Sequence, residues 1–163
     1  MSKVFFEVEI AGVTSGKIVF ELFEDLAKKT TDFFKGLCTS EKLSYKGTKF
    51  HRIINLFLAQ GGDLTSEKGT GVGKTSSEEK LPDDYLKRKH DAPYLLSMVN
   101  TGTNTNNTQF FITFVACPWF DGKNIVFGKV VEGKEIVDKI HQRAGTSNGK
   151  PNVEVKIIDC GLA

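Results

Sequence analysis

The stretch VFFEVEIAGVTSGKIVFELF, residues 4–23, decides the fold class of this chain of 163 residues. Every second residue from 4 to 10 is apolar, and the alternation resumes over residues 16–23 after a turn segment that contains glycine. A period of two places apolar side chains on one face of a β-strand. Two such strands joined by a short turn predict an antiparallel hairpin with one buried face.

Further along the chain, short apolar runs predict more strands, and two segments change to a helical period. The strand-like runs are residues 50–54, 57–60, 94–100, 109–115, 124–131 and 153–157. Apolar residues recur at helical spacing in residues 28–39 and 134–143, which predicts two helices. About eight strands without β-α-β alternation predict a mainly β fold, a closed eight-stranded antiparallel barrel capped by two α-helices. We expect residues 1–163 to form a single domain.

The composition is that of an ordinary globular protein. Hydrophobic residues make up 39% and charged residues 26%, and the formal net charge is +2. No apolar run approaches the roughly 18 residues that a membrane-spanning helix needs. Because there is no basic block, we expect no nucleic-acid or membrane partner. Because there is no signal-peptide pattern, we expect a cytoplasmic location. We also expect a monomer.

Several familiar motifs fail on spacing. Residues 69–75, GTGVGKT, look like a phosphate-binding loop, but the position that requires the first glycine is Lys68. None of the three histidines has a second ligand at metal spacing, and the three cysteines lie far apart. The sequence therefore predicts neither a metal site nor a cofactor.

Cys117 lies two residues before Trp119, the only tryptophan. A redox-sensitive thiol is one interpretation, but a thiolate needs a nearby cation and the nearest basic residue in the sequence is Lys123. We expect an unreactive thiol. Trp119, taken alone, is expected to cap the core rather than to form part of a ligand surface.

Arg52 stands out because the chain has only 3 arginines against 19 lysines. Composition alone favours a solvent-exposed residue on the outside of a barrel. The alternative is a guanidinium at the edge of a phenylalanine-lined cavity, where its planar set of donors could hold a carbonyl or an amide.

Seven motifs, in order, closely resemble those of the cyclophilins. They are FHRII (50–54), FLAQGGD (57–63), LSMVN (96–100), NTN (104–106), QFFI (109–112), WFDGK (119–123) and VFG (126–128). The resemblance extends from about Val4 to Gly161. It implies a peptidyl-prolyl cis-trans isomerase that acts on X-Pro bonds of peptides and proteins, built as a barrel capped by two helices.

The resemblance also implies a role for individual residues, with Arg52 as the catalytic one. It implies a proline pocket formed by Phe57, Leu58, Phe111 and Phe120; peptide-backbone contacts from Gln60, Asn100 and Gln109; a groove border of Gly69, Val99, Thr101 and Trp119; and a rim of His51 and Asn124. It implies no cofactor. Expected partners are proline-containing peptides and proteins, and cyclosporin-type cyclic peptides as inhibitors.

The sequence departs from the common family pattern at several of these positions. The family usually has Met, Ala, Leu and His where this chain has Leu58, Val99, Phe120 and Asn124, and Pro-Gly where it has Asn55-Leu56. Two other function classes stay open: a module that binds proline segments without turnover, and a barrel that encloses a small apolar ligand. Small barrels are usually filled by their own side chains, which disfavours the last class.

His51 precedes Arg52 and invites a general-base role. Neighbouring residues of a strand point to opposite faces, so both side chains do not readily enter one groove. Rotation about an amide bond also needs no proton transfer. We therefore expect no catalytic base at His51.

Overall fold

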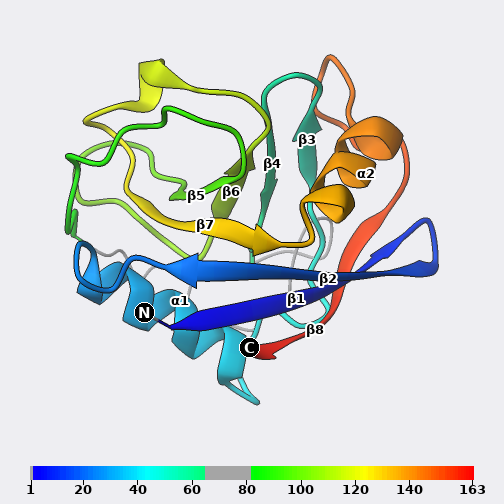
Figure 1. The fold of residues 1–163 in the computed structure, drawn as a ribbon, viewed down its shortest axis with the longest axis horizontal. Helices are drawn as coiled ribbons and strands as arrows, with labels where there is room; N and C mark the ends of the chain where they lie inside the picture. Colours follow the sequence, from blue (N-terminus) through cyan, green and yellow to red (C-terminus); the bar gives the residue numbers. More distant parts are fainter. Residues whose placement is uncertain (1, 65–81) are drawn as a thin grey trace.

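Eight strands form one antiparallel sheet in the computed structural model, which describes residues 2–64 and 82–163 (Figure 1). The strands are β1 (Lys3–Ile10), β2 (Val13–Leu22), β3 (Arg52–Ile54), β4 (Leu58–Gly61), β5 (Leu95–Met98), β6 (Phe110–Thr113), β7 (Val126–Glu132) and β8 (Val155–Leu162). Neighbouring strands follow the order β3-β4-β6-β5-β7-β2-β1-β8. The helices are α1 (Lys28–Thr39) and α2 (Lys134–Ala144), and η1 (Pro118–Phe120) is a short 3-10 turn. The predicted mainly β architecture with two helices is confirmed.

The predicted N-terminal hairpin is β1 and β2, which pair with Val4 opposite Phe20 and Phe6 opposite Ile18. These four side chains are fully buried. Opposed apolar residues on one face of an antiparallel pair contact each other directly. The alternation read from the sequence therefore corresponds to the core-facing side of the sheet.

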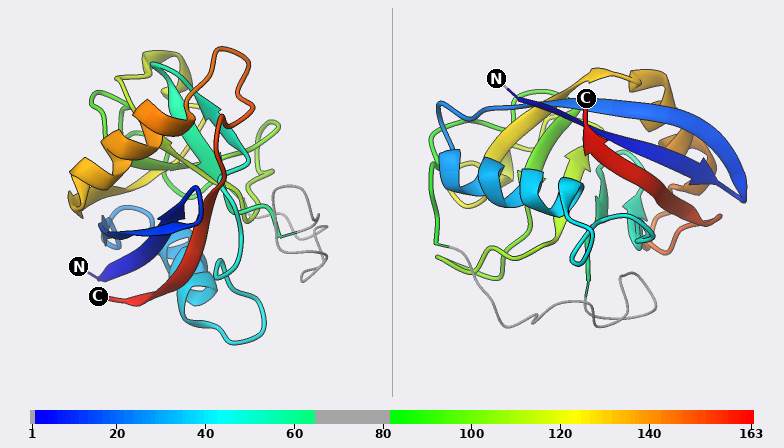
Figure 2. Two further views of the ribbon diagram at one scale, coloured as in Figure 1. Left: turned by 90° about the vertical axis from the view of Figure 1, so that its right-hand side faces the viewer. Right: turned by 90° about the horizontal axis from the view of Figure 1, so that it is seen from below.

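The barrel is closed by a loop and not by a strand ladder. β3 and β8 are the end strands of the sheet, and residues 47–50, just before β3, run beside β8 instead. The Phe50 N–H donates to the Val155 carbonyl and the Ile157 N–H donates to the Thr48 carbonyl, both at 2.9 Å. The expected closed barrel is thus a strongly curled sheet with a loop seam (Figure 2). This loop replaces a strand pair at the seam, because it forms hydrogen bonds with main-chain N–H and C=O groups of the edge strand β8.

The two helices lie at different ends of the curled sheet, α1 at the lower left and α2 at the upper right of Figure 1. Phe34 of α1 enters the core and is fully buried. Its ring lies 4.9–6.4 Å, between centroids, from the rings of Phe6, Phe20, Tyr45, Phe110 and Phe127. Helix α2 buries Ile136, Val137, Ile140 and Ala144. An aromatic cluster under α1 is therefore the centre of the core.

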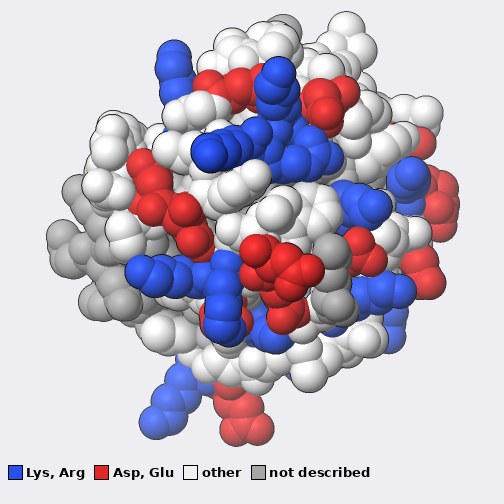
Figure 3. All heavy atoms as spheres, turned by 60° about the vertical axis from the view of Figure 1, so that its left-hand side comes forward, with Lys and Arg blue, Asp and Glu red and all other residues white. Residues whose placement is uncertain are grey.

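Charged side chains of both signs are interspersed on the face shown in Figure 3. Neither α1 nor α2, the helices of the described ranges, is long and apolar enough to cross a membrane. Within residues 2–64 and 82–163, no group of His, Cys, Asp or Glu side chains could hold a metal ion.

We expect Phe34→Ala to lower the free energy of unfolding by about 3–5 kcal/mol, because the truncated ring leaves a cavity among five aromatic neighbours. Phe33→Ala is the matched control on the same helix. Phe33 is only half-buried, so its truncation should cost about 1 kcal/mol. Urea unfolding measures both values, and equal losses in the two variants would show that Phe34 is not the anchor of α1.

Candidate functional site

The registers of four strands place one row of side chains on the outer face of the sheet. Arg52 of β3 pairs with Gln60 of β4, Gln60 pairs with Phe111 of β6, and Phe111 pairs with Ser97 of β5. Directly opposed residues share a face of the sheet. The adjacent row faces the core and is at most 1% exposed: Ile53, Ala59, Ile112 and Leu96.

A hollow of about 340 Å³ lies over the outer row. Strands β3, β4 and β6 form its floor, and residues 99–100 and 119–124 form its walls. Ten of the residues that the resemblance implies for the site line it: Arg52, Phe57, Leu58, Gln60, Val99, Asn100, Phe111, Trp119, Phe120 and Asn124. Residues far apart in the sequence are thus brought together by the pairing of the strands.

Aromatic rings form the apolar part of the hollow. The Phe120 ring stacks on Phe57 with centroids 5.7 Å apart and lies 5.1 Å from the Phe111 ring. The ring centroids of Trp119 and Phe57 lie 5.6 Å apart, and Trp119 is 53% exposed. The expectation that Trp119 caps the core is therefore wrong: Phe120, its neighbour in η1, packs against Phe111, and the indole stays at the surface beside Phe57.

Arg52 is exposed and lines the hollow on the side of β3. The aliphatic part of its side chain lies against Gly149. The Ile53 N–H donates to the Gly149 carbonyl at 2.9 Å, which holds this glycine beside β3. A Cβ at Gly149, whose φ is +88°, would be 3.0 Å from the Arg52 Cγ. Glycine suits this position because it tolerates the positive φ and leaves room for the arginine stem.

Polar groups near the hollow are partly engaged and partly free. The Gln60 side chain donates to the Gln109 Oε1 at 2.9 Å, so Gln109 holds Gln60 although it does not itself line the hollow. The Asn100 amide donates to the Lys123 carbonyl at 2.9 Å. The main-chain N–H and C=O of Asn100 make no hydrogen bond to any described residue. These main-chain groups are available to a ligand.

Two other residues implied for the site, His51 and Thr101, do not line the hollow. His51 is half-buried next to Arg52, and burial lowers its pKa. Thr101 is exposed, and its N–H donates to the Thr105 Oγ1 at 2.8 Å. Gly69 and the rest of the phosphate-loop-like segment 69–75 lie outside the described residues.

Asn124, expected at the rim, is buried. It does line the hollow, but its amide donates to the Met98 carbonyl at 2.9 Å. The side chain satisfies a main-chain acceptor of β5, so its polar end faces the protein. The structure therefore places Asn124 in the wall of the hollow, and its contact with a substrate stays a prediction.

His90 supports the aromatic rings from behind, and nothing in the sequence indicated it. Its fully buried ring stacks on Phe111 at 6.0 Å and contacts Phe120 at 5.7 Å, between centroids. The Nδ1 lies 3.0 Å from the Asp121 Oδ1 and the Nε2 lies 2.9 Å from the Ser97 Oγ. His90 thereby joins the sheet to the loop that walls the hollow. A lone histidine has no sequence signal that predicts such long-range partners.

The chemistry of the site follows from these groups. It offers an apolar recess, a guanidinium and main-chain groups that have no partner among residues 2–64 and 82–163, and these residues supply no paired nucleophile and base to it. Burial raises the pKa of Cys117 to about 11, which disfavours the thiolate that oxidation requires. The arrangement suits binding and reshaping of an amide beside an apolar ring rather than bond cleavage.

One protein-family model matches nearly the whole chain. Its description is "Cyclophilin type peptidyl-prolyl cis-trans isomerase/CLD", and the match covers residues 5–162. The match includes every strand of the curled sheet except the first residues of β1, and both helices.

We expect the free energy of unfolding to fall as the pH drops from about 7.5 to about 5.5. Burial lowers the pKa values of His51, His90 and His141 from the usual 6.5, so the unfolded chain binds protons that the folded chain does not. The three histidines contribute fully to the free energy of unfolding when the pH is above their pKa in the unfolded chain. This contribution is lost as the pH falls through their lower pKa values in the folded chain. Urea unfolding across this window measures the slope, with His141→Gln expected to reduce it. A free energy that stays constant or rises on acidification would contradict the expectation.

Proposed function

Because the chain belongs to the cyclophilin-type peptidyl-prolyl cis-trans isomerases, we propose that Arg52 is the catalytic residue and that the hollow beside it binds the proline ring. The family acts on proline-containing peptides. The observation that carries the assignment is the exposed guanidinium on Gly149 at the edge of a recess made by phenylalanine rings.

The reaction is a rotation and breaks no covalent bond. Resonance gives the X-Pro amide a barrier of roughly 18–20 kcal/mol, and uncatalysed exchange takes tens of seconds or longer. A turnover near 10³ per second requires a barrier lower by very roughly 7 kcal/mol. In the twisted amide the prolyl nitrogen has lost conjugation, which makes it a better hydrogen-bond acceptor. A donor from Arg52 near that nitrogen would stabilise the twisted state more than either planar state, and this difference is catalysis.

The other residues would confine the rotation to one bond. The rings of Phe57, Phe111 and Phe120 form a recess of suitable chemistry for a pyrrolidine ring. The free main-chain groups of Asn100 and the Gln60 side chain would hold the flanking peptide. Fixing both sides of the amide removes motions that do not lead to the twisted state.

We also propose that the partners are peptides and proteins, and that the chain acts on them as a monomer without nucleic acid, a membrane or a cofactor. The net charge of +2 and the mixed signs on the face shown in Figure 3 support the exclusion of nucleic acid and membranes, because neither creates an extended basic surface there.

We expect Arg52→Ala to reduce kcat/KM for a short X-Pro peptide by about 100-fold to 1000-fold, the cost of losing one transition-state donor. Arg52→Lys keeps the charge but not the planar set of donors, so it should recover little of the loss. Arg143→Ala, on the exposed side of α2, is the matched control and should keep the wild-type rate. Peptide exchange measured by NMR gives the rates, and unfolding curves check that each variant is folded. Unchanged turnover in folded Arg52→Ala would exclude the mechanism.

The pH profile tests the same proposal independently. The wild-type rate should be nearly flat from about pH 6 to about pH 9, because the rotation moves no proton and an arginine side chain is not deprotonated in proteins. His51→Gln should keep most of the activity. A bell-shaped profile with a limb near the histidine pKa, lost in a folded His51→Gln variant, would make His51 catalytic.

We expect a cyclosporin-type cyclic peptide to bind at the hollow and to compete with the peptide substrate. Trp119 is the only tryptophan, lines the hollow and is exposed, so its fluorescence should change on binding. Trp119→Phe should abolish the signal and weaken inhibition of isomerisation. Titration to saturating inhibitor with neither a fluorescence change nor competition would count against binding here.

A further inference from the structure

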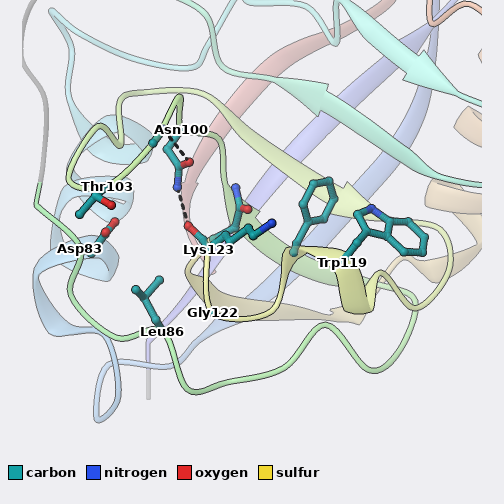
Figure 4. A pocket seen from close by; sticks show the side chains of 10 residues that line it. Asp83, Leu86, Asn100, Thr103, Trp119, Gly122 and Lys123 are labelled. Carbon is teal, nitrogen blue, oxygen red and sulfur yellow. Dashed lines mark hydrogen bonds between the residues drawn. The ribbon is translucent and has the colours of Figure 1, made fainter.

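A second hollow, of about 610 Å³, adjoins the first. The two share Asn100, Trp119, Phe120 and Asn124, so one wall separates them. The remaining lining residues of the second hollow are Asp83, Leu86, Gly102, Thr103, Gly122 and Lys123. Figure 4 shows Asp83 and Leu86 on one side of this space and Trp119 on the other, with Asn100 and Lys123 between them.

Hydrogen bonds hold the walls of the second hollow in place. The Asp83 N–H donates to the Asn104 Oδ1 at 2.7 Å, and the Asn104 N–H donates back to the Asp83 Oδ2 at 3.1 Å. The Asn106 amide donates to the other Asp83 oxygen at 2.9 Å. Opposite them, Asn100 ties its loop to the Lys123 carbonyl, a contact drawn in Figure 4. A space framed in this way is formed before a ligand arrives, which lowers the cost of binding.

The two charged residues of this hollow, Asp83 and Lys123, differ in whether their side chains already have hydrogen-bond partners. Both carboxylate oxygens of Asp83 accept hydrogen bonds from the 104–106 loop. The Lys123 side chain is exposed and makes no ion pair or hydrogen bond with any residue of the described ranges. Asp121, two residues away, is engaged by His90. Asp83 keeps its negative charge, but both of its oxygens already accept hydrogen bonds, so Lys123 is the charged group of this hollow that can form a new ion pair with a ligand.

We propose that the second hollow is a subsite for an acidic side chain of the substrate, bound by the ammonium group of Lys123. The inference rests on the proposed function, because the occupant is the continuation of a peptide whose proline lies in the first hollow. An extended peptide advances about 3.3 Å per residue, so residues close to the proline can cross the shared wall. The substrate class is proline peptides with Asp or Glu within about three residues of the X-Pro bond.

The test compares kcat/KM for peptides that carry Glu, Ala or Lys at each of the three positions on either side of the X-Pro bond. At low salt, Glu should exceed Ala by about twofold to fivefold in at least one position, the size of an exposed ion pair. Lys should fall below Ala at the same position. The preference should shrink at about 1 M salt, where charges are screened over roughly 3 Å.

Variants identify the group responsible. Lys123→Gln should bring the Glu-to-Ala ratio to about one, and Lys123→Glu should invert it in favour of the Lys peptide. Lys139→Gln, at an exposed position of α2, is the matched control and should keep the wild-type ratio. Unfolding curves establish that each variant is folded.

The outcomes separate the two proposals. If the Ala peptide is isomerised but the Glu-to-Ala ratio is the same in wild type and folded Lys123→Gln, the subsite is wrong and the proposed function stands. If none of the peptides is isomerised by the wild-type protein, the proposed function itself fails.

Discussion

The site depends on the register of β3, β4, β6 and β5. In the observed register Arg52, Gln60 and Phe111 lie in one row on the outer face, and the next row, from Ile53 onward, lies in the core. Side chains alternate along a strand, so a slip by one residue in any of these strands would exchange its two faces. Burial of the apolar row opposes such a slip, because it would expose residues such as Ile53 and Ile112 and bury a guanidinium. Core packing thus fixes the orientation of the polar groups.

A sheet face forms a hollow only when a neighbouring segment rises beside it. Here that segment, the wall, is η1 and the turn after it, residues 118–124. His90 connects this wall to the sheet, since one ring nitrogen faces Asp121 of the turn and the other faces Ser97 of β5. The ring itself packs against both Phe111 and Phe120. A buried, hydrogen-bonded polar group of this kind restricts the relative position of two apolar rings more tightly than apolar contact does. The distance between floor and wall therefore depends on a residue that does not line the hollow.

Local periodicity was sufficient to predict the strands, the helices and the antiparallel class, because alternation in residues 4–10 and helical spacing in residues 28–39 are properties of neighbouring residues. The candidate site came from motif resemblance, and its assigned roles stay proposals. What the sequence did not show depends on contacts between distant segments: the loop seam beside β8, Gly149 under Arg52, His90 behind the rings, and the exposure of Trp119. Trp119 shows the reason plainly, since composition does not tell whether the tryptophan or the adjacent Phe120 packs against Phe111.

Two departures from the common family pattern, Phe120 and Asn124, lie in the wall that the two hollows share, whereas Arg52 and Gly149 lie on the opposite side of the first hollow. Phe120 adds a ring that stacks on Phe57, and Asn124 fastens the wall to β5 through the Met98 carbonyl. Under the proposed mechanism the rotation requires only a donor near the prolyl nitrogen and an apolar seat for the ring, and neither depends on the identity of residue 124. Substitutions in the shared wall can therefore change which flanking residues fit while the catalytic group stays in place, and peptide preference can diverge within this fold without loss of the reaction.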